Sequence, residues 1–262
     1  MEKHISTHKK LLKIGIIGVN PYNTNLGVSA LAYSCLSIFK QIIKENNLNA
    51  EITLIGSTGK HTDEITIRDE KIRFYNVQSL DYFKVKSILK IILLAKRYNF
   101  WRILNSDIIF DISEGDSFTD IYGNKRYKRI LNSKRLFNFL NIKQVMLPQT
   151  IGPFNKKENE NKAFKIMQMI EKIISRDGNS YKYTSQFLPN NKIMNSIDVA
   201  FDLPFEKTSF NKELIHVGLN ISGLLWHGGY TKNNQFNLKS DYQELIQQTI
   251  SFFLGYHKNI QL

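Results

Sequence analysis

Four carboxylates lie close together after the apolar segment that ends at Asp111, in the sequence DISEGDSFTDIYG of residues 111–123. After a strand of an α/β fold, such a cluster supplies a general base, binds a metal ion or holds the hydroxyls of a sugar. Gly115 lets the backbone turn close to a ligand. The structural alternative is a helix start, where acidic side chains cap the first turn and interact favourably with the helix dipole. The carboxylates are Asp111, Glu114, Asp116 and Asp120.

A second polar turn follows another apolar segment, residues 144–147, in the sequence LPQTIGPF of residues 147–154. Its two prolines restrict the backbone of the turn, so polar groups are held in place at a small cost in entropy. Gln149 and Thr150 both donate and accept hydrogen bonds. Ligands of open α/β sheets bind at the carboxyl ends of strands. The turn therefore predicts binding of a polar substrate such as a sugar.

The loop of residues 20–27, between the first apolar segment and a helix, is a third candidate site. Free backbone N–H groups at a helix start receive anions. Asn25 and Gly27 lie there, but the spacing is neither that of a dinucleotide fingerprint nor that of a P-loop. An ordinary strand-to-helix turn is the alternative.

Arg176 and His227 are the remaining candidates. Arg176 follows an apolar segment and could fork onto a carboxylate or phosphate, or pair with Asp177 or Asp198 in a structural role. His227 precedes a pair of glycines and could donate a proton near neutral pH. The alternative for His227 is a surface histidine without a function.

Apolar segments alternate with segments of helical periodicity along most of the chain. Strands separated by helices of this length predict parallel β-α-β units and an α/β, doubly wound parallel sheet. We expect extended segments at residues 14–19, 50–55, 72–77, 107–112, 144–147, 173–175 and 193–199, and helices at 28–44, 81–104, 133–140, 156–171 and 181–188.

A change in pattern near Pro204 indicates a linker into a second domain. A strand over residues 216–221 and a helix over 241–254 then follow. We expect an N-terminal α/β domain over residues 1–210 and the beginning of a second α/β domain over 211–262. A unit of about 50 residues rarely buries enough surface to stand alone, so we expect the second domain to be incomplete.

The chain carries 36 Lys and Arg against 23 Asp and Glu, a formal net charge of +13. This charge favours an anionic partner, or it reflects compositional drift in a chain rich in Lys, Asn and Ile. The basic residues are spread out, without the basic and aromatic runs of nucleic-acid motifs, so we expect no nucleic-acid partner. The basic, amphipathic helix over 84–104 could contact an anionic membrane face, or cover the core with a solvated basic side.

The single cysteine, Cys35, excludes an internal disulfide and fits a reducing compartment. It lies among apolar residues, which indicates a buried, unreactive thiol. No stretch approaches the ~20 apolar residues of a membrane span. We therefore expect a cytoplasmic protein, with the inner face of the membrane as a second location. No His or Cys set has ligand spacing, so we expect no metal and no cofactor.

Five motifs in a fixed order resemble the polysaccharide pyruvyl transferase family, over about residues 14–254. The resemblance implies a two-domain enzyme of the glycosyltransferase-B type, with its site in the cleft between the domains. It also implies transfer of a pyruvyl group from phosphoenolpyruvate to a sugar of a surface polysaccharide or lipid-linked oligosaccharide precursor, which forms a ketal and releases phosphate. The motifs are GDSFTDIYG (115–123), LPQTIGPF (147–154), SRDGNS (175–180), DVAFDLP (198–204) and NISGLLWHGGYT (220–231).

Such a reaction needs an acid, a base and cations for a phosphate and a carboxylate. On the resemblance, Asp116 is the expected base, His227 is the expected acid from the second domain, and Arg176 contacts an anionic group. The other substrate-binding residues expected on this basis are Asn25, Gly27, Glu114, Ser117, Asp120, Gln149 and Thr150.

The chain departs from the family pattern at two places. Where many members have two glycines before the aspartate, this chain has Glu114 and Gly115. Family members also continue for roughly half a domain beyond the position of Leu262, with basic and histidine residues that help to bind the donor. The alternatives are a sugar-nucleotide-dependent glycosyltransferase on the same type of fold, and an inactive remnant that binds a glycan or a partner protein.

Overall fold

A computed structural model of the chain describes residues 9–77, 99–113, 118–207, 209–229, 232–256 and 259–262. The chain divides into two compact units, Met1–Pro204 and Phe205–Leu262. This division follows Pro204, whereas the sequence analysis placed the end of the first domain at residue 210.

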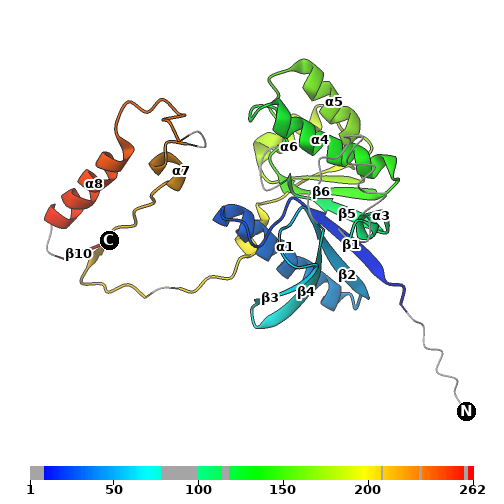
Figure 1. Cartoon of the computed structure of the whole chain (residues 1–262), viewed down its shortest axis with the longest axis horizontal. Coiled ribbons are helices and arrows are strands. Elements are labelled where there is room, and N and C mark those ends of the chain that lie inside the picture. Colours follow the sequence, from blue (N-terminus) through cyan, green and yellow to red (C-terminus); the bar gives the residue numbers. More distant parts are fainter. Residues whose placement is uncertain (1–8, 78–98, 114–117, 208, 230–231, 257–258) are drawn as a thin grey trace, which may run out of the picture. The chain divides into compact units, whose positions relative to one another are not determined.

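The first unit contains alternating strands and helices over most of its length (Figure 1). The strands are β1 (Leu12–Ile17), β2 (Ala50–Ile55), β3 (Thr62–Ile67), β4 (Glu70–Val77), β5 (Ile108–Asp111), β6 (Lys143–Gln149), β7 (Lys172–Ser175) and β8 (Ile193–Asn195). The helices are α1 (Leu26–Glu45), α3 (Trp101–Leu104), α4 (Asn124–Phe139), α5 (Lys157–Met167), α6 (Gly178–Ser185) and the 3-10 turn η2 (Val199–Asp202).

These strands form one eight-stranded sheet in the order β3-β4-β2-β1-β5-β6-β7-β8. Every neighbouring pair is parallel except β3 and β4, which form an antiparallel hairpin at one edge. The chain runs outward from β1 on one side and returns to β5 on the other side. This order confirms the predicted doubly wound α/β fold. Strands covered on both faces read as continuous apolar runs, and in β2 the adjacent residues Leu54 and Ile55, which point to opposite faces, are both buried.

Helices cover both faces of the sheet. Ile16 of β1 and Leu54 of β2 pack with α1 on one face. Ile55 and Ile109 point to the opposite face, where they pack with α3 and α4. The helices α4 and α5 continue this layer over β6 and β7, and Figure 1 shows α4, α5 and α6 gathered together.

Helix α1 is long and apolar enough to cross a membrane, by length and composition alone. The expectation that no stretch of the chain has this character is therefore wrong. The helix carries a buried stripe that includes Leu31, Leu36 and Phe39. Core helices share this composition because one face packs on a sheet. Packing against β1 and β2 accounts for the apolar residues of α1 without a membrane.

Cys35 lies in the buried stripe of α1, 1% exposed, as expected for an unreactive thiol. Burial, with a smaller effect from the charge of Asp198, raises the pKa of the thiol to about 12. The thiol therefore stays protonated at neutral pH, and the protonated form is a poor nucleophile.

Several element boundaries differ from those expected. The hairpin strand β3 was not predicted, and α4 begins at Asn124 rather than at residue 133. The first turns of α4 are rich in Lys and Arg, so the apolar periodicity of the buried residues Tyr127 and Ile130 was not recognised in the sequence. The expected extended segment 193–199 ends at Asn195. Of the predicted helix 81–104, residues 81–98, which carry most of its basic face, lie outside the described residues.

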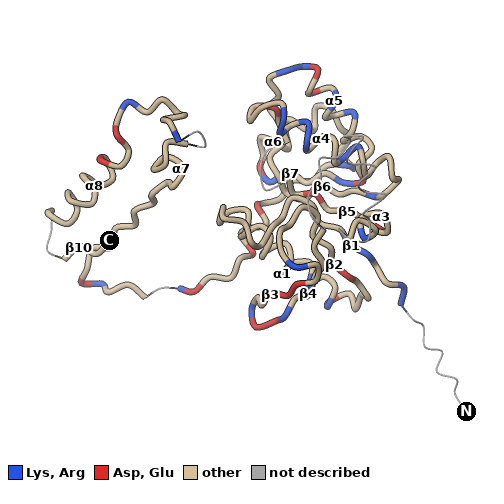
Figure 2. The backbone as a smooth tube through the Cα atoms, viewed as in Figure 1, with Lys and Arg blue, Asp and Glu red and all other residues tan. Residues whose placement is uncertain are grey.

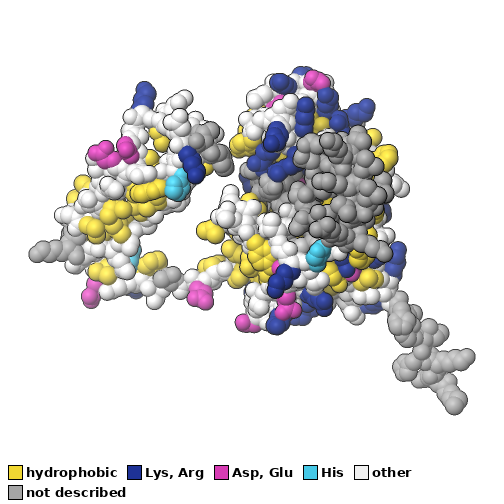
Figure 3. Space-filling model, viewed as in Figure 1, with side chains coloured by type: hydrophobic (Ala, Val, Ile, Leu, Met, Phe, Trp, Pro, Cys, Tyr) yellow, Lys and Arg dark blue, Asp and Glu magenta, His cyan; other side chains and the backbone are white. Residues whose placement is uncertain are grey.

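The second unit contains β9 (Ile215–His216), α7 (Gly223–Trp226), α8 (Tyr242–Tyr256) and β10 (Ile260–Gln261). The strands β9 and β10 pair in parallel, which is the connectivity of an α/β domain. Strand β9 is shorter than the expected strand 216–221. Among the described residues of this unit, Ile246 is the one buried apolar side chain. Figure 3 shows apolar side chains on the unit's surface. Phe252 and Leu254 of α8 are both exposed.

Candidate functional site

A pocket of about 90 Å³ lies at the carboxyl ends of β1, β2 and β5. Because the chain leaves β1 for β2 on one side and comes back to β5 on the other, this is the topological switch point of the sheet. Open α/β sheets bind their ligands at this place. Drug-sized ligands fill roughly 300–1,000 Å³, so this pocket suits a small ligand or one end of a larger one. Its lining residues are Ile17, Gly18, Val19, Asn20, Asn23, Val28, Ile55, Gly56, Asp111, Ser113, Arg129, Ile130 and Ser133.

The loop between β1 and α1 forms one wall of the pocket. Asn20 accepts a hydrogen bond from the backbone N–H of Tyr22 (3.0 Å), and Asn23 accepts one from the N–H of Asn25 (2.8 Å). Asn25 in turn caps α1 by accepting from the N–H of Gly27 (3.0 Å). Asn25 and Gly27 are exposed at the helix start, while Asn20 and Asn23 line the pocket.

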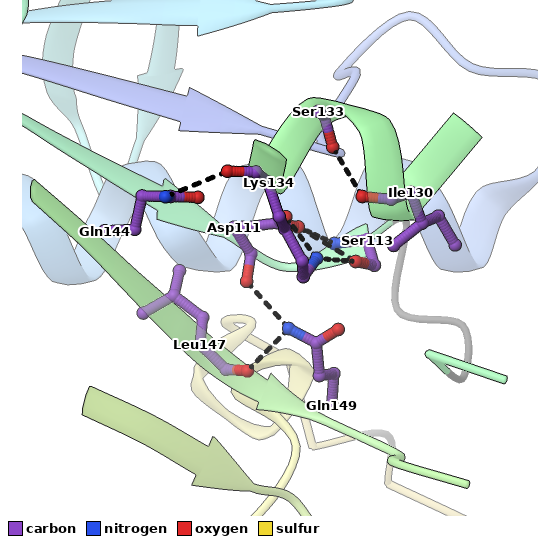
Figure 4. A network of polar contacts seen from close by, with 8 residues as sticks. All are labelled: Asp111, Ser113, Ile130, Ser133, Lys134, Gln144, Leu147 and Gln149. Carbon is purple, nitrogen blue, oxygen red and sulfur yellow. Dashed lines mark hydrogen bonds and ion pairs between the residues drawn. The ribbon is translucent and has the colours of Figure 1, made fainter. Parts of the chain in front are cut away.

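At the end of β5, a residue of the pocket lining belongs to a buried ion pair. Lys134 of α4 is fully buried, and its Nζ lies 2.5 Å from Oδ2 of Asp111. The other carboxylate oxygen of Asp111 accepts hydrogen bonds from the N–H (2.8 Å) and the hydroxyl (2.9 Å) of Ser113. Figure 4 shows these three side chains joined at the end of β5. Asp111 is thus part of a closed polar network, and its charge is paired.

Gln149 is turned into the protein. Its side chain is fully buried, and its Nε2 donates to the carbonyl oxygens of Asp111 (2.8 Å) and Leu147 (3.2 Å) (Figure 4). In this arrangement Gln149 connects the ends of β5 and β6 and does not line the pocket. The sequence suggested a substrate contact for this residue, and the structure gives its amide nitrogen two backbone carbonyl partners.

The structure brings the turns after β5 and β6 together. Phe118 and Ile151 form a parallel β-bridge, with Phe118 N–H donating to the carbonyl of Thr150 (2.8 Å) and Gly152 N–H to the carbonyl of Phe118 (3.0 Å). The two motifs that the sequence analysis singled out for sugar binding are therefore neighbours in space, as their positions after parallel strands predict.

Asp120 connects the segment after β5 to the segment after β6 through hydrogen bonds. Its carboxylate accepts from the N–H groups of Asn155 (2.6 Å) and Lys156 (3.2 Å) and from Nδ2 of Asn159 (2.7 Å). Burial by itself would raise the pKa of Asp120, but the hydrogen bonds from Asn159, Asn155 and Lys156 outweigh it, and the pKa lies below the ordinary value of 3.8. A buried carboxylate with this many donors holds a loop in place.

We expect Asp120→Asn to destabilise the first unit by about 2–3 kcal/mol at neutral pH, because a carboxamide cannot accept from all three donors. A lowered folded-state pKa contributes stability above the unfolded value of 3.8, and that stability is lost as the pH falls through the folded value. The difference between wild type and variant, measured by urea unfolding, should therefore be present at ~pH 7 and shrink toward ~pH 3. A difference that does not change with pH would contradict the role of the charge.

Thr150 and Arg176 lie together at the carboxyl ends of β6 and β7. The Nε of Arg176 donates to the Thr150 hydroxyl (2.8 Å), and its Nη1 lies 3.0 Å from Oδ2 of Asp198. Both Arg176 and Asp198 are partly exposed. Of the two structural partners considered for Arg176, Asp198 forms this ion pair, while Asp177 caps α6. An anion that reaches Arg176 would share it with Asp198.

Four of the predicted catalytic and binding positions cannot be placed with this cluster. Glu114, Asp116 and Ser117 lie outside the described residues, so their roles remain predictions. His227 belongs to the second unit, where it is exposed and follows the short helix α7.

Three polar residues of the pocket lining, Ser113, Arg129 and Ser133, were not singled out from the sequence. Lys134 was not singled out either; it does not line the pocket but contacts Asp111 and Ser113, which do. A signal for Lys134 was present, because it stands one helical turn after the apolar Ile130 and one turn before Phe137. A lysine on the buried side of a helix needs a partner of opposite charge. Ser113 has a backbone φ of 51°, a value that sequence alone does not indicate for a serine.

The fold and the pocket define a doubly wound α/β protein with a small pocket, lined in part by polar side chains, at the switch point of its sheet. The sequence model of the polysaccharide pyruvyl transferase family matches residues 25–261. The chain belongs to this family, and it is therefore a transferase that acts on polysaccharides or their precursors.

Other comparisons add little. No curated protein matches the sequence. Among solved structures, the chain is similar to the FeoB G-domain from Methanococcus jannaschii, with 15% identity over 72% of this chain and 91% of that chain and a TM-score of 0.29. A similarity this weak gives no basis for inferring the activity of this chain.

Proposed function

We propose that this chain transfers the pyruvyl group of phosphoenolpyruvate to two hydroxyls of a sugar in a surface polysaccharide precursor, with a cyclic ketal and phosphate as products. The observation that carries the proposal is the pocket at the switch point, in a chain of the polysaccharide pyruvyl transferase family. Asn20, Asn23 and Ser133 offer hydrogen-bonding groups to hydroxyls, and Arg129 brings a cation to the lining. These are the groups that a sugar and an anionic donor require.

The reaction begins with protonation of the methylene carbon of phosphoenolpyruvate, which makes the neighbouring carbon electrophilic. One sugar hydroxyl forms a C–O bond to that carbon and loses its proton to a base. A second hydroxyl forms the other C–O bond as the C–O bond to phosphate breaks. Phosphate departs with the bonding electrons and takes up the proton of the second hydroxyl. Asp116 is the proposed base and His227 the proposed acid.

Arg176 is the proposed contact for a phosphate or carboxylate oxygen, with Thr150 and Asp198 fixing its guanidinium. A planar guanidinium suits these anions because it donates two parallel hydrogen bonds. Asn25 and Gly27 border the same edge of the sheet, beside the pocket residues Asn23 and Val28.

We place the reaction in the cytoplasm, with a lipid-linked oligosaccharide acceptor reached at the inner face of the membrane. The net charge of +13 favours approach to an anionic surface. Figure 2 shows that Lys and Arg are spread over the first unit.

The test is phosphate release from phosphoenolpyruvate by the purified chain in the presence of surface-polysaccharide oligosaccharides. Acceptor-dependent release, together with a gain of one pyruvyl ketal per product by mass spectrometry, is the expected result. Sugar nucleotides in place of phosphoenolpyruvate are the comparison. Turnover with a sugar nucleotide and none with phosphoenolpyruvate would overturn the proposal in favour of glycosyl transfer.

A further inference from the structure

We propose that Lys134 is a positioning residue for the pocket, which acts by fixing Ser113 through Asp111. The proposal deepens the proposed function, because it assigns a role in the same pocket to a side chain that no substrate touches. Lys134 has no exposed surface, whereas Asp111 and Ser113 both line the pocket.

The geometry ties all three side chains into a closed triangle. Lys134 Nζ donates to Asp111 (2.5 Å) and to the hydroxyl of Ser113 (3.3 Å). Asp111 accepts from the N–H and the hydroxyl of Ser113. The ring of Phe118 closes the site, with its centroid 4.7 Å from the ammonium.

Ser113 needs this support because its backbone is in the left-handed region, with φ at 51°. Residues other than glycine are strained there and hold the conformation only when their surroundings impose it. The backbone N–H and the hydroxyl of Ser113 both donate to Asp111, and these two hydrogen bonds hold the strained conformation. Lys134 holds that carboxylate in one orientation, and the carboxylate in turn fixes the backbone of Ser113.

Helix α4 is itself fixed to the neighbouring strand. Gln144 of β6 donates from Nε2 to the carbonyl of Lys134 (3.1 Å) (Figure 4). Gln149, also on β6, holds the carbonyl of Asp111 (2.8 Å). The carboxylate and the backbone of Asp111 are therefore anchored separately, one through α4 and the other through β6.

Stability alone does not require an ion pair at this position. Buried ion pairs can often be replaced by apolar residues of similar volume without loss of stability, whereas removal of one partner leaves an uncompensated charge. The three side chains of Lys134, Asp111 and Ser113 include a strained residue of the pocket lining. Their arrangement is therefore better explained by the geometry that it imposes on the pocket than by stability.

Three variants separate positioning from charge compensation. Lys134→Met removes the ammonium and leaves the carboxylate. Lys134→Met combined with Asp111→Asn removes both charges and keeps an oxygen that accepts from Ser113. Lys128→Met makes the same change at an exposed position of α4 and is the matched control.

We expect Lys134→Met to lower the melting temperature by roughly 10 °C. We also expect it to lower the kcat of the folded protein by a factor on the order of 100. The double variant should regain most of the melting temperature and little of the kcat. The Ser113 amide, followed by NMR hydrogen exchange, should lose protection in both variants and keep it in Lys128→Met.

Recovery of both melting temperature and kcat in the double variant would overturn the proposal, as would wild-type kcat and unchanged Ser113 exchange in Lys134→Met. If the wild-type chain releases no phosphate from phosphoenolpyruvate, the proposed function fails, and the Ser113 exchange measurement then decides the positioning role by itself.

Discussion

Turnover of the Asp116→Asn variant is expected to fall by about 10²–10⁴-fold, with binding of the acceptor oligosaccharide retained. The acceptor hydroxyl must lose a proton as its oxygen attacks, and a carboxamide cannot take that proton. The change keeps the size of the side chain, so the loss should be in kcat and not in KM. Phosphate release measures kcat, and isothermal calorimetry with the acceptor measures binding.

The matched control is Asp69→Asn, which makes the same chemical change in the turn between β3 and β4, outside the pocket lining. Its turnover should equal that of wild type. Retained binding together with unchanged turnover in Asp116→Asn would rule out Asp116 as the base. A loss of binding alone would instead make it a substrate contact.

Gly152→Ala is expected to destabilise the first unit by roughly 3 kcal/mol. Gly152 lies in the turn after β6 with a φ of 67°, where L-residues are disfavoured. A Cβ built at this position would lie 2.3 Å from the Cε1 atom of Tyr183. The Tyr183 ring cannot move aside easily, since Phe154, Phe164 and Phe187 pack around it. Urea unfolding measures the effect.

Gly178→Ala is the control for this prediction. Gly178 begins α6, and a Cβ added there would meet no atom within 4 Å. An alanine at that position should leave stability unchanged or raise it by about 0.4–1 kcal/mol, because it restricts the unfolded chain. Equal stabilities of the two alanine variants would show that the turn after β6 tolerates a side chain.

The turn after β6 illustrates how far sequence reasoning reached the site. Its prolines, glycine and polar side chains predicted a rigid loop at the end of a strand, and the structure places it beside the turn after β5. The sequence did not predict that Gln149 would turn inward. A glutamine has the same chemistry whether it faces a ligand or a backbone carbonyl, and the choice depends on the neighbouring strand.

Arg176 and Asp120 also show which features the sequence predicted and which it did not. Both were chosen because they follow strands or lie near them, and both are at the carboxyl edge of the sheet. Asp198 was one of two partners that the sequence offered for Arg176, whereas Asn159, the partner of Asp120, was not predicted. Local patterns do not decide between such partners, because the distance between them is set by the packing of whole elements.

The sequence by itself determined the doubly wound class of the first unit, the family, and most of the strands and helices. Hydrophobic periodicity is a local property, and it is sufficient to indicate which segments are buried on one face or on both. Tertiary structure alone decided the order of strands and therefore the position of the pocket between β1, β2 and β5. It also decided that Lys134 would neutralise Asp111 behind that pocket. Burial of a charge is tolerated only where an opposite charge meets it, and that meeting occurs only when α4 packs against β5.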